Sequence, residues 1–323
     1  MRKSTVDVLI VGAGPAGLAA GIQLKKSGIK NVRVIEREAH AGGIPRHSHH
    51  PGYGIRDLKR FISGPEYAKR YLQTAITAGV EVSTSTTATN WIDKNTLQLT
   101  SPFGLEQVKA DAIILATGAR ERARAARSVA GKRGDGVYTT GSLQQATYLE
   151  KLYIGKKAVI VGAEHVSLSA VLTLKHAGVK TVAMICPDKK HQTLFGAPTL
   201  LSLLFRFKYL ANTQIIELLG DSRVSGVRVE KDGKELLIDA DTIIFTGDWI
   251  PDHELVRRGG FAVDSKYKSP ILTVNNQIPD TNIFVVGNLL LPIKAADQCA
   301  VSAKKVAKYI ANQLLEKQKV KVA

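Results

Sequence analysis

The sequence predicts an α/β protein made of two similar parts, each a parallel sheet with helices packed on its faces. An apolar run rich in β-branched residues, a glycine-rich turn and a helical segment follow one another near the N-terminus, and the same order returns 150 residues later. The composition agrees with this, because 44% of the 323 residues are hydrophobic and 23% are charged, as in globular proteins of about two domains.

The first strand–turn–helix unit has the order that a dinucleotide-binding site requires. Residues 7–11 predict a buried parallel strand, and the turn at residues 12–17 follows directly. Residues 18–24 predict a helix, and residues 32–35 predict the next strand. We interpret this stretch as a Rossmann-like fold, in which the N–H groups and positive dipole end of the helix face a pyrophosphate.

Each glycine of the turn has a separate role in such a site. Gly12 allows the tight turn, Gly14 leaves room for the pyrophosphate to approach the backbone, and Gly17 lets the helix pack closely on the strand. Glu36 ends the second strand, 24 residues after Gly12, where its carboxylate can accept hydrogen bonds from the adenosine ribose. This combination predicts a bound dinucleotide.

Three later segments resemble landmarks of flavoproteins that carry two dinucleotide folds, and together they indicate FAD. The first is a Gly-Gly turn after the second strand, the second is an apolar strand that ends in Ala-Thr-Gly, and the third is a late strand that ends in Gly-Asn. These landmarks are residues 42–43, 116–118 and 287–288. Such flavoproteins carry an aspartate where this chain has Asn288, but an amide can also hydrogen-bond a ribityl hydroxyl.

The second strand–turn–helix unit repeats the pattern along residues 157–185, but its motif is degraded. When the two turns are aligned on Gly12 and Gly162, the second glycine position is Glu164 and the third is Ser167. The position equivalent to Glu36 is Cys186. We expect the Glu164 carboxylate to hinder a pyrophosphate by its bulk and charge, so NAD(P)H binding here is an open question, with another nucleotide or a purely structural fold as the alternatives.

The loop at residues 44–57 follows the Gly-Gly turn and is expected beside the flavin. It contains three histidines within four residues, at 47, 49 and 50. We predict that Arg46, His47 and His50 are catalytic, because a cation there can stabilise negative charge on the flavin or bind a substrate carboxylate. A metal site at these histidines is disfavoured, because no carboxylate or cysteine ligands occur at matching spacing. The other alternative is a polar surface loop without a catalytic role.

Segments along nearly the whole chain resemble one family of FAD-dependent oxidoreductases, of the pyridine nucleotide-disulfide type but without a redox dithiol. The family includes the flavin subunits of hydrogen cyanide synthase, opine oxidase and dye-linked proline and hydroxyproline dehydrogenases. The matching segments are residues 42–71, 118–122, 136–141, 161–167, 247–251 and 287–290. The resemblance implies a glutathione-reductase-like architecture, with an FAD domain at residues 1–120 and 255–323 and an inserted NAD(P)-binding-like domain at residues 121–254.

The resemblance also implies which residues hold FAD. They are Gly12, Ala13, Gly14, Pro15, Ala16, Gly17, Glu36, Arg37, Gly42, Gly43, Ile44, Arg46, Val82, Ala116, Thr117, Gly118, Gly287, Asn288, Ala295 and Ala296. The last two begin a helix predicted over residues 295–317, whose N-terminus can point at the flavin. One departure is Leu291, because relatives tend to carry a histidine at the corresponding position, and this puts proton transfer at that place in doubt.

The resemblance implies that the chain is an oxidoreductase subunit that oxidises an amino or imino acid or a related small metabolite and passes electrons to a second carrier. It also implies a partner subunit or an acceptor protein. Two alternatives stay open: an NAD(P)H-dependent electron-transfer subunit, and a non-enzymatic flavin-binding partner. A thioredoxin-reductase-like enzyme is disfavoured, because the two cysteines form no C-x-x-C pair.

The formal charge of +17 favours anionic partners, but the basic residues are dispersed and no nucleic-acid motif is present. The exception is a knot of arginines and lysines within residues 120–133, which we expect to be a solvated surface. No apolar run is long enough to span a membrane, and the first one is too short for a signal peptide, so the expected compartment is the cytoplasm.

Overall fold

The computed structural model describes residues 1–188 and 197–322 and divides the chain into two compact units. Unit 1 comprises Met1–Arg46, Pro51–Arg120 and Ile250–Ala323, and unit 2 comprises His47–His50 and Glu121–Trp249. The α/β architecture with two parallel sheets confirms the predicted fold class.

Unit 1 is built on a seven-stranded sheet in the order β5-β2-β1-β8-β7-β6, with β20 also paired to β8. Its strands are β1 (Arg2–Val11), β2 (Val32–Ile35), β5 (Glu81–Ser83), β6 (Thr87–Asp93), β7 (Thr96–Ser101), β8 (Gly104–Leu115) and β20 (Ile283–Val285). The strands β5, β2, β1, β8 and β20 run parallel, which is the arrangement that the apolar, β-branched runs predict.

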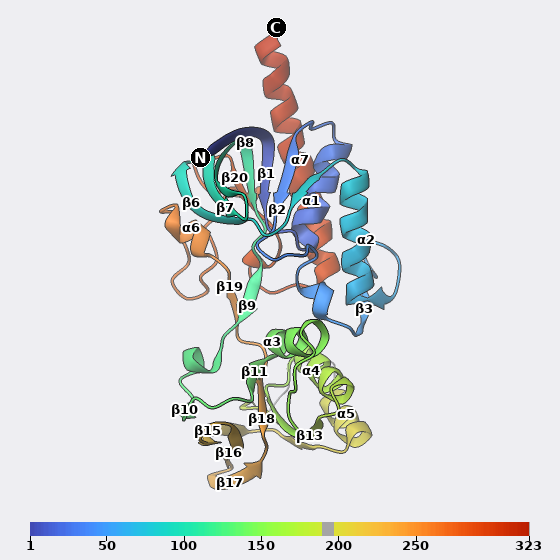
Figure 1. Cartoon of the computed structure of the whole chain (residues 1–323), viewed down its shortest axis with the longest axis vertical. Helices are drawn as coiled ribbons and strands as arrows, with labels where there is room; N and C mark the ends of the chain where they lie inside the picture. The colour runs from blue at the N-terminus through green and yellow to red at the C-terminus, as the bar shows by residue number, and fades with distance from the viewer. Residues whose placement is uncertain (189–196, 323) are drawn as a thin grey trace. The chain divides into compact units, whose positions relative to one another are not determined.

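Helices cover one face of this sheet, as Figure 1 shows. They are α1 (Pro15–Lys26), α2 (Gly64–Thr77) and α7 (Ala296–Val322), whose buried residues form one core with alternate side chains of β1, β2 and β8. A second core on the other face includes residues of β7, β20 and the short helix α6 (Glu254–Arg258). Unit 1 also holds the short pair β3 (Pro51–Tyr53) and β4 (Ile62–Ser63).

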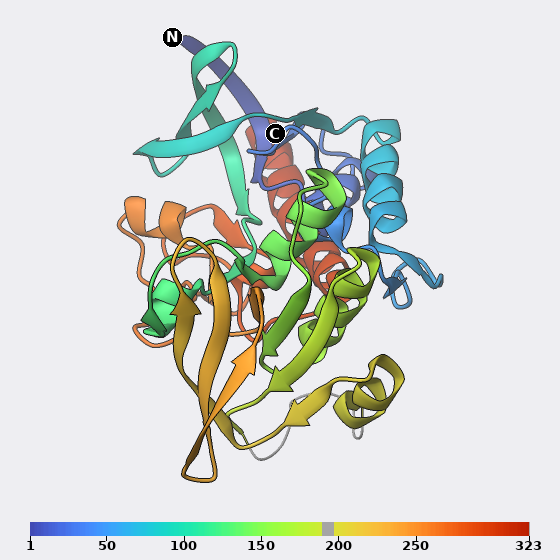
Figure 2. The same cartoon turned by 60° about the horizontal axis from the view of Figure 1, so that its bottom comes forward.

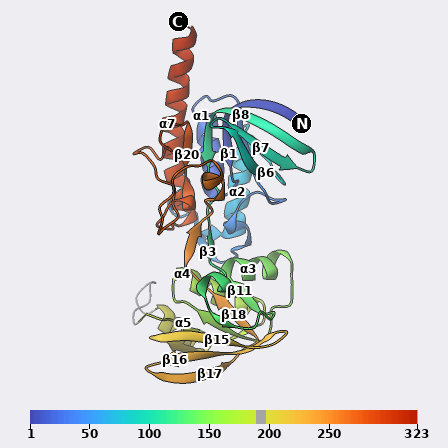
Figure 3. The same ribbon diagram turned by 90° about the vertical axis from the view of Figure 1, so that its left-hand side faces the viewer.

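Unit 2 packs two sheets against each other (Figure 3). The parallel sheet contains β11 (Val137–Thr139), β18 (Thr242–Phe245), β12 (Lys157–Val161), β13 (Lys180–Ile185) and β14 (Lys208–Leu210). The other sheet contains β10 (Ala130–Gly131), β15 (Thr213–Gly220), β16 (Val224–Lys231) and β17 (Lys234–Asp239), and Figure 2 shows its long antiparallel strands.

The helices of unit 2 are α3 (Thr140–Gln144), which continues into a π-helical turn at Gln145–Leu149, α4 (His165–His176) and α5 (Ala197–Phe205). Short 3-10 turns occur at Ile44–His47, Arg124–Arg127 and Gly287–Leu289. The chain leaves unit 1 through β9 (Ala119–Glu121) and returns through β19 (Trp249–Pro251), and these two strands pair with each other.

The apolar segment at residues 200–207 indicates a core helix or a partner face, and we favour the core. This preference is wrong, because three leucines of α5 are more than half exposed. The basic knot is partly a solvated surface, as expected, since Arg120, Lys132 and Arg133 are exposed. Arg124 and Arg127 also donate hydrogen bonds to backbone carbonyls within unit 2. Among the described residues, no helix is both long enough and apolar enough to cross a membrane.

Candidate functional site

The segments singled out in the sequence meet at one edge of the unit 1 sheet. β1, β8 and β20 end in register, since Val11 lies beside Leu115 and Leu115 lies beside Val285. The residues that follow these strands therefore lie close together, as expected for the carboxyl ends of parallel strands. A 2.8 Å hydrogen bond from the Gly12 backbone N–H to the Ile35 carbonyl also joins the glycine turn to the end of β2.

Two glycines of the turn are required by packing. Gly12 has a φ of 107°, and a Cβ there would lie 2.5 Å from the Ala116 carbonyl oxygen. A Cβ at Gly17 would lie 1.9 Å from the Gly12 carbonyl oxygen, so only glycine lets α1 start this close to β1. The Ala-Thr-Gly landmark thus packs directly on the glycine turn.

Gly14 is different, because a Cβ there would have no atom nearer than Gly43 Cα at 4.0 Å. The space beside it is bounded by backbone, since a Cβ at Gly43 (φ 62°) would lie 2.9 Å from Gly14 Cα. Gly287 packs against the same turn, because a Cβ added at Gly287 would lie 2.8 Å from Ala16 Cβ. The turn, the Gly-Gly segment and the Gly-Asn segment therefore converge around Gly14.

The N-terminus of α1 has no side-chain cap, and Pro15 occupies its first turn. Glu36 is buried at the end of β2, where its Oε2 accepts a 3.0 Å hydrogen bond from the Ala13 backbone N–H and its Oε1 accepts one from the Glu38 N–H. Each carboxylate oxygen keeps a further lone pair for a hydroxyl. The uncapped helix and the buried acid lie at the same turn, as a dinucleotide needs.

Arg46 is held within unit 1 by an ion pair with Glu38. Its backbone N–H donates a 3.0 Å hydrogen bond to the Gly43 carbonyl, and a Cβ at Gly42 would lie 3.7 Å from Arg46 Cβ. Its Nε is buried and has no hydrogen-bond partner among the described residues. Ile44, which follows the Gly-Gly turn, is exposed.

Three predicted residues lie around Asp252, which the sequence did not single out. Thr117 Oγ1 donates a 2.7 Å hydrogen bond to the Asp252 carbonyl, and the Asp252 N–H donates to the Gly118 carbonyl at 2.9 Å. Arg37 forms an ion pair with the Asp252 carboxylate at 3.2 Å. Val82 lies apart from this group in β5, paired with Val34 of β2.

Asn288 holds the loop that leads to α7. Its Oδ1 accepts a 2.8 Å hydrogen bond from the Lys294 N–H, and its Nδ2 donates to the Lys294 carbonyl at 3.0 Å. The buried thiol of Cys299 also lies 3.3 Å from Asn288 Oδ1. Burial raises the pKa of Cys299 to about 11, so the thiol is a neutral donor at this position.

Ala295 and Ala296 mark the start of α7, where the Ala295 N–H donates a 3.1 Å hydrogen bond to Gln298 Oε1. The next residue, Asp297, is buried and binds both the backbone N–H and the guanidinium of Arg56, at 3.0 and 3.2 Å. The loop after the histidines is thereby fastened to the N-terminus of α7. An acidic residue in the first turn of a predicted helix was the available signal for this contact.

A carboxylate with two tyrosines supports the same loop. Tyr67 and Tyr71 of α2 donate hydrogen bonds of 2.5 and 2.6 Å to Asp57 Oδ2. Burial and the neighbouring carboxylate raise the pKa of both phenols above their usual range, so both remain donors. These three residues share no sequence motif, so the cluster was not predicted.

His47 and His50 belong to unit 2 by their contacts. His47 is buried, and its Nδ1 lies 3.3 Å from Gln144 Oε1, while Gln144 donates a 2.7 Å hydrogen bond to Ser169 Oγ. His49 stacks on Tyr148 with a centroid distance of 3.9 Å. No group of three or more potential metal ligands occurs in the described parts of the chain.

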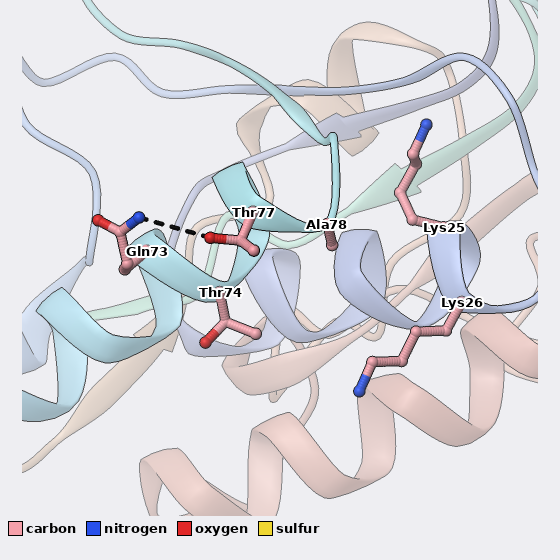
Figure 4. A pocket seen from close by; sticks show the side chains of 6 residues that line it. All are labelled: Lys25, Lys26, Gln73, Thr74, Thr77 and Ala78. Atoms are coloured by element: carbon pink, nitrogen blue, oxygen red, sulfur yellow. Dashed lines mark hydrogen bonds between the residues drawn. The ribbon is translucent and has the colours of Figure 1, made fainter.

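A pocket of ≈ 430 Å³ lies elsewhere in unit 1, at the C-terminal ends of α1 and α2 (Figure 4). It is lined by Lys25, Lys26, Gln73, Thr74, Thr77 and Ala78. None of the residues assigned to FAD lines this pocket, so we do not place the functional site there.

The residues at the glycine turn fit the adenosine diphosphate half of FAD. Gly14 leaves the backbone open to a phosphate, the uncapped start of α1 offers N–H donors, and the Glu36 carboxylate can accept from a ribose. When bound there, FAD supplies two-electron redox chemistry, while the chain supplies its orientation and charge environment.

Comparison with known proteins agrees with this site. Residues 6–308 match the family model described as "Pyridine nucleotide-disulphide oxidoreductase". The chain is 26% identical over 285 residues to an opine oxidase subunit of Rhizobium meliloti, a match that covers 79% of this chain and 52% of that protein. It is also 26% identical over 328 residues to thioredoxin reductase of Treponema pallidum, covering 95% and 98% of the two chains.

Among solved structures, the thioredoxin reductase of T. acidophilum superposes with a TM-score of 0.80 at 20% identity, covering 96% of this chain and 98% of that one. The chain spans about half the length of the opine oxidase subunit. The resemblance inferred from the sequence motifs is confirmed by these matches. The chain belongs to the pyridine nucleotide-disulphide oxidoreductase family and is an FAD-dependent oxidoreductase.

Proposed function

We propose that this chain is the flavin-bearing component of a dehydrogenase or oxidase that oxidises an amino or imino acid, or a related small metabolite, and passes the electrons to a second carrier. The observation that carries this proposal is a glycine turn that fits the adenosine diphosphate half of FAD, in a chain whose two cysteines form no pair. The two cysteines, Cys186 and Cys299, are buried and belong to different units. A dithiol relay needs two neighbouring thiols, so we infer that the flavin reacts directly with a small molecule.

The likeness to the opine oxidase protein supports both the substrate class and a partner chain. That protein is named as an oxidase and as one subunit of it, and it aligns with most of this chain. We infer that a partner subunit or an acceptor protein takes the electrons here as well.

The proposed reaction removes a hydride from a C–H beside an amine, leaving an imine and a proton. Arg46 is the residue to which we assign a role in binding negative charge. Its backbone N–H and Cβ lie against the Gly42–Gly43 turn, its guanidinium pairs with Glu38, and its buried Nε has no partner among the described residues. It would bind a substrate carboxylate or stabilise negative charge that develops at the flavin. A catalytic role of His47 and His50 stays a prediction from the sequence, since both residues belong to unit 2.

Anaerobic bleaching of the flavin tests this proposal. The FAD-loaded chain is mixed with proline, hydroxyproline, sarcosine, glycine or glycerol 3-phosphate, and the flavin absorbance is followed. We expect at least one amino acid to bleach the flavin, and an artificial acceptor to restore its colour. An Arg46→Met variant that still holds FAD should show a raised KM for that amino acid, and an unchanged KM would remove Arg46 from this role.

The main competing function is an electron-transfer subunit that is reduced by NAD(P)H. The match to thioredoxin reductase over nearly its whole length favours this alternative. Bleaching by NADH or NADPH but by none of the organic substrates would establish it. If nothing bleaches the flavin, a non-enzymatic or partner-dependent flavin protein is the better description.

A further inference from the structure

The glycine turn of unit 2 has the same backbone course as that of unit 1, but a side chain fills it. Gly162 follows β12 with a φ of 127°, and a Cβ there would lie 2.6 Å from Glu164 Oε2. A Cβ at Gly247, which lies just after β18, would be 2.6 Å from Glu164 Oε1. The Glu164 carboxylate therefore lies between two glycines, at the edge of the sheet where a dinucleotide fold receives its phosphates.

Hydrogen bonds hold this carboxylate in place. Thr246 Oγ1 donates to Glu164 Oε2 at 2.7 Å, and Ser167 Oγ donates to the same oxygen at 3.0 Å. Glu164 is also the N-cap of α4, where its backbone N–H donates a 3.1 Å hydrogen bond to Ser167 Oγ and its carbonyl accepts one of 3.0 Å from the Ser167 N–H. The Ser167 hydroxyl, at the start of α4, is thus engaged by Glu164.

The first turn provides the internal comparison. Gly14 stands at the position of Glu164, and a Cβ there would have no atom nearer than 4.0 Å. The two folds share a topology but differ at the position where the ligand's phosphates would bind. In unit 1 the space beside Gly14 is open, whereas in unit 2 the Glu164 carboxylate occupies the equivalent space.

A cation of unit 2 interacts electrostatically with the Glu164 carboxylate. It is Arg127, which donates a 2.8 Å hydrogen bond to the carbonyl of Gly247, one of the two glycines that flank the carboxylate. At the place where unit 1 has Glu36, unit 2 has Cys186, whose thiol is buried. Burial raises the pKa of Cys186, so it stays neutral and offers a ribose no carboxylate.

We propose that Glu164 closes the second nucleotide fold to NADH and NADPH, because its carboxylate stands where a dinucleotide phosphate would bind. The family is named for a pyridine nucleotide, and the residues of unit 2 do not fit one. The flavin is then reduced by its organic substrate and not by NAD(P)H bound to this fold. The inference concerns unit 2 and holds whichever substrate the proposed function has.

Four FAD-loaded proteins test this inference by calorimetric titration with NADH and with NADPH: the wild type, Glu164→Gly, Glu164→Gln and Glu235→Gln. We expect no saturable binding by the wild type up to about 1 mM, and at least about tenfold tighter binding by Glu164→Gly, a difference of about 1.4 kcal/mol. Glu164→Gln keeps the volume but loses the charge, so it should lie between them. Glu235 is an exposed acid of β17 in the same unit, and its variant controls for the loss of one negative charge.

Micromolar binding of either nucleotide by the wild type would overturn the proposal. It would also fail if Glu164→Gly held FAD, unfolded cooperatively and bound no more tightly than the wild type. Should Glu164→Gly not fold, Glu164→Gln decides alone, since equal affinity to the wild type would contradict a role for the charge. Bleaching by amino acids is measured separately, so a failure of the proposed function leaves this result readable.

Discussion

Two glycines of one motif have different reasons for being glycine. At Gly17 the reason lies in the protein, because a Cβ would lie 1.9 Å from the Gly12 carbonyl oxygen. At Gly14 the protein leaves room, and its extended backbone with a φ of −77° suits any residue. The structure thus separates a packing requirement from a ligand requirement within four residues of sequence.

This difference predicts opposite behaviour of two alanine variants. Gly17→Ala should destabilise the FAD-free protein by about 2 kcal/mol or more, since the new methyl group overlaps backbone. Gly14→Ala should leave the stability of the FAD-free protein within about 0.5 kcal/mol but weaken FAD binding by about tenfold or more, because the methyl group stands in the path of the phosphate. Denaturant unfolding of the FAD-free proteins and FAD titration measure the two effects. Equal FAD affinity in wild type and Gly14→Ala would contradict the assigned site.

A buried ion pair joins three strands of the unit 1 sheet. Arg33 of β2 and Glu106 of β8 are 7% and 6% exposed and bond at 3.0 Å, and Arg2 of β1 reaches the same carboxylate. Burial alone would raise the pKa of Glu106, but hydrogen bonds from Arg33, Arg2 and Ser4 outweigh it and lower the pKa to about 2. The carboxylate is therefore charged in the folded protein throughout the neutral and mildly acidic range.

Removal of this charge should be costly in a pH-dependent way. Glu106→Gln leaves the buried Arg33 guanidinium with the exposed Glu81 as its acidic partner, so we expect a loss of about 3 kcal/mol at neutral pH. Because the folded pKa lies below the usual 4.5, the stabilisation is complete above pH 4.5 and is lost as the pH falls toward 2. The stabilities of wild type and variant should therefore converge over that window in denaturant unfolding. Glu81→Gln removes an acid that also pairs with Arg33 but is 62% exposed, and it should cost at most about 1 kcal/mol.

At the scale of single elements, the apolar helix α5 shows where the sequence misled. Its run of leucines favoured a core helix over a partner face, yet Leu200, Leu203 and Leu204 are 59%, 73% and 66% exposed. Periodicity cannot tell a core face from an exposed apolar face, because both are hydrophobic stripes. In contrast, Leu174 of α4 is buried in the core beside the parallel sheet of unit 2.

The two helices should respond differently to truncation. Leu203→Ala should change the free energy of unfolding by less than about 0.5 kcal/mol, because truncation of this exposed side chain leaves no cavity. Leu174→Ala should cost about 2–5 kcal/mol, because it removes buried methyl groups from a packed core. Thermal and denaturant unfolding of the two variants check this pair. A large loss in Leu203→Ala would restore the core interpretation of α5.

The elements that could be predicted are those with a continuous local signal. The first two strands, their glycine turn and α1 follow from neighbouring residues, and β2 begins and ends where its apolar run does. The strands β15–β17 carry mixed polar patterns and were not anticipated. Likewise, the contact of His47 with Gln144 joins segments 97 residues apart, and no local pattern reports such a pairing.

For the candidate site, the sequence predicted the motif residues but not the residues that hold them in position. Gly12, Gly17 and Gly287 must be glycine because of close contacts, with backbone at the first two and with the Ala16 side chain at the third, so the sequence reveals them. Asp252 and Asp57 act through ordinary hydrogen bonds, which many residue types provide elsewhere, so the sequence does not reveal them. The sequence indicated that Glu164 occupies the second glycine turn, but the Thr246 hydroxyl that binds it lies 82 residues away, just after β18.

At the scale of the whole molecule, the formal charge of +17 should influence encounters with charged electron acceptors. Once the flavin has been reduced, reoxidation by ferricyanide should slow by about tenfold as the ionic strength rises from low values to about 0.5 M, because salt screens the attraction. A neutral quinone of similar potential should show little change and serves as the control. Stopped-flow absorbance measures both rates, and equal salt dependence would exclude electrostatic guidance.

The pairing of β9 with β19 has a consequence for how this architecture can be rebuilt. The chain's departure from unit 1 and its return lie side by side, as Figure 1 shows, so the cut ends would need only a short bridge if residues 122–248 were excised. Unit 1 also has its own cores and the whole glycine-turn site. A different domain inserted between β9 and β19 should therefore leave the flavin-binding residues of unit 1 intact. In evolution, the inserted domain can be exchanged while unit 1 stays unchanged.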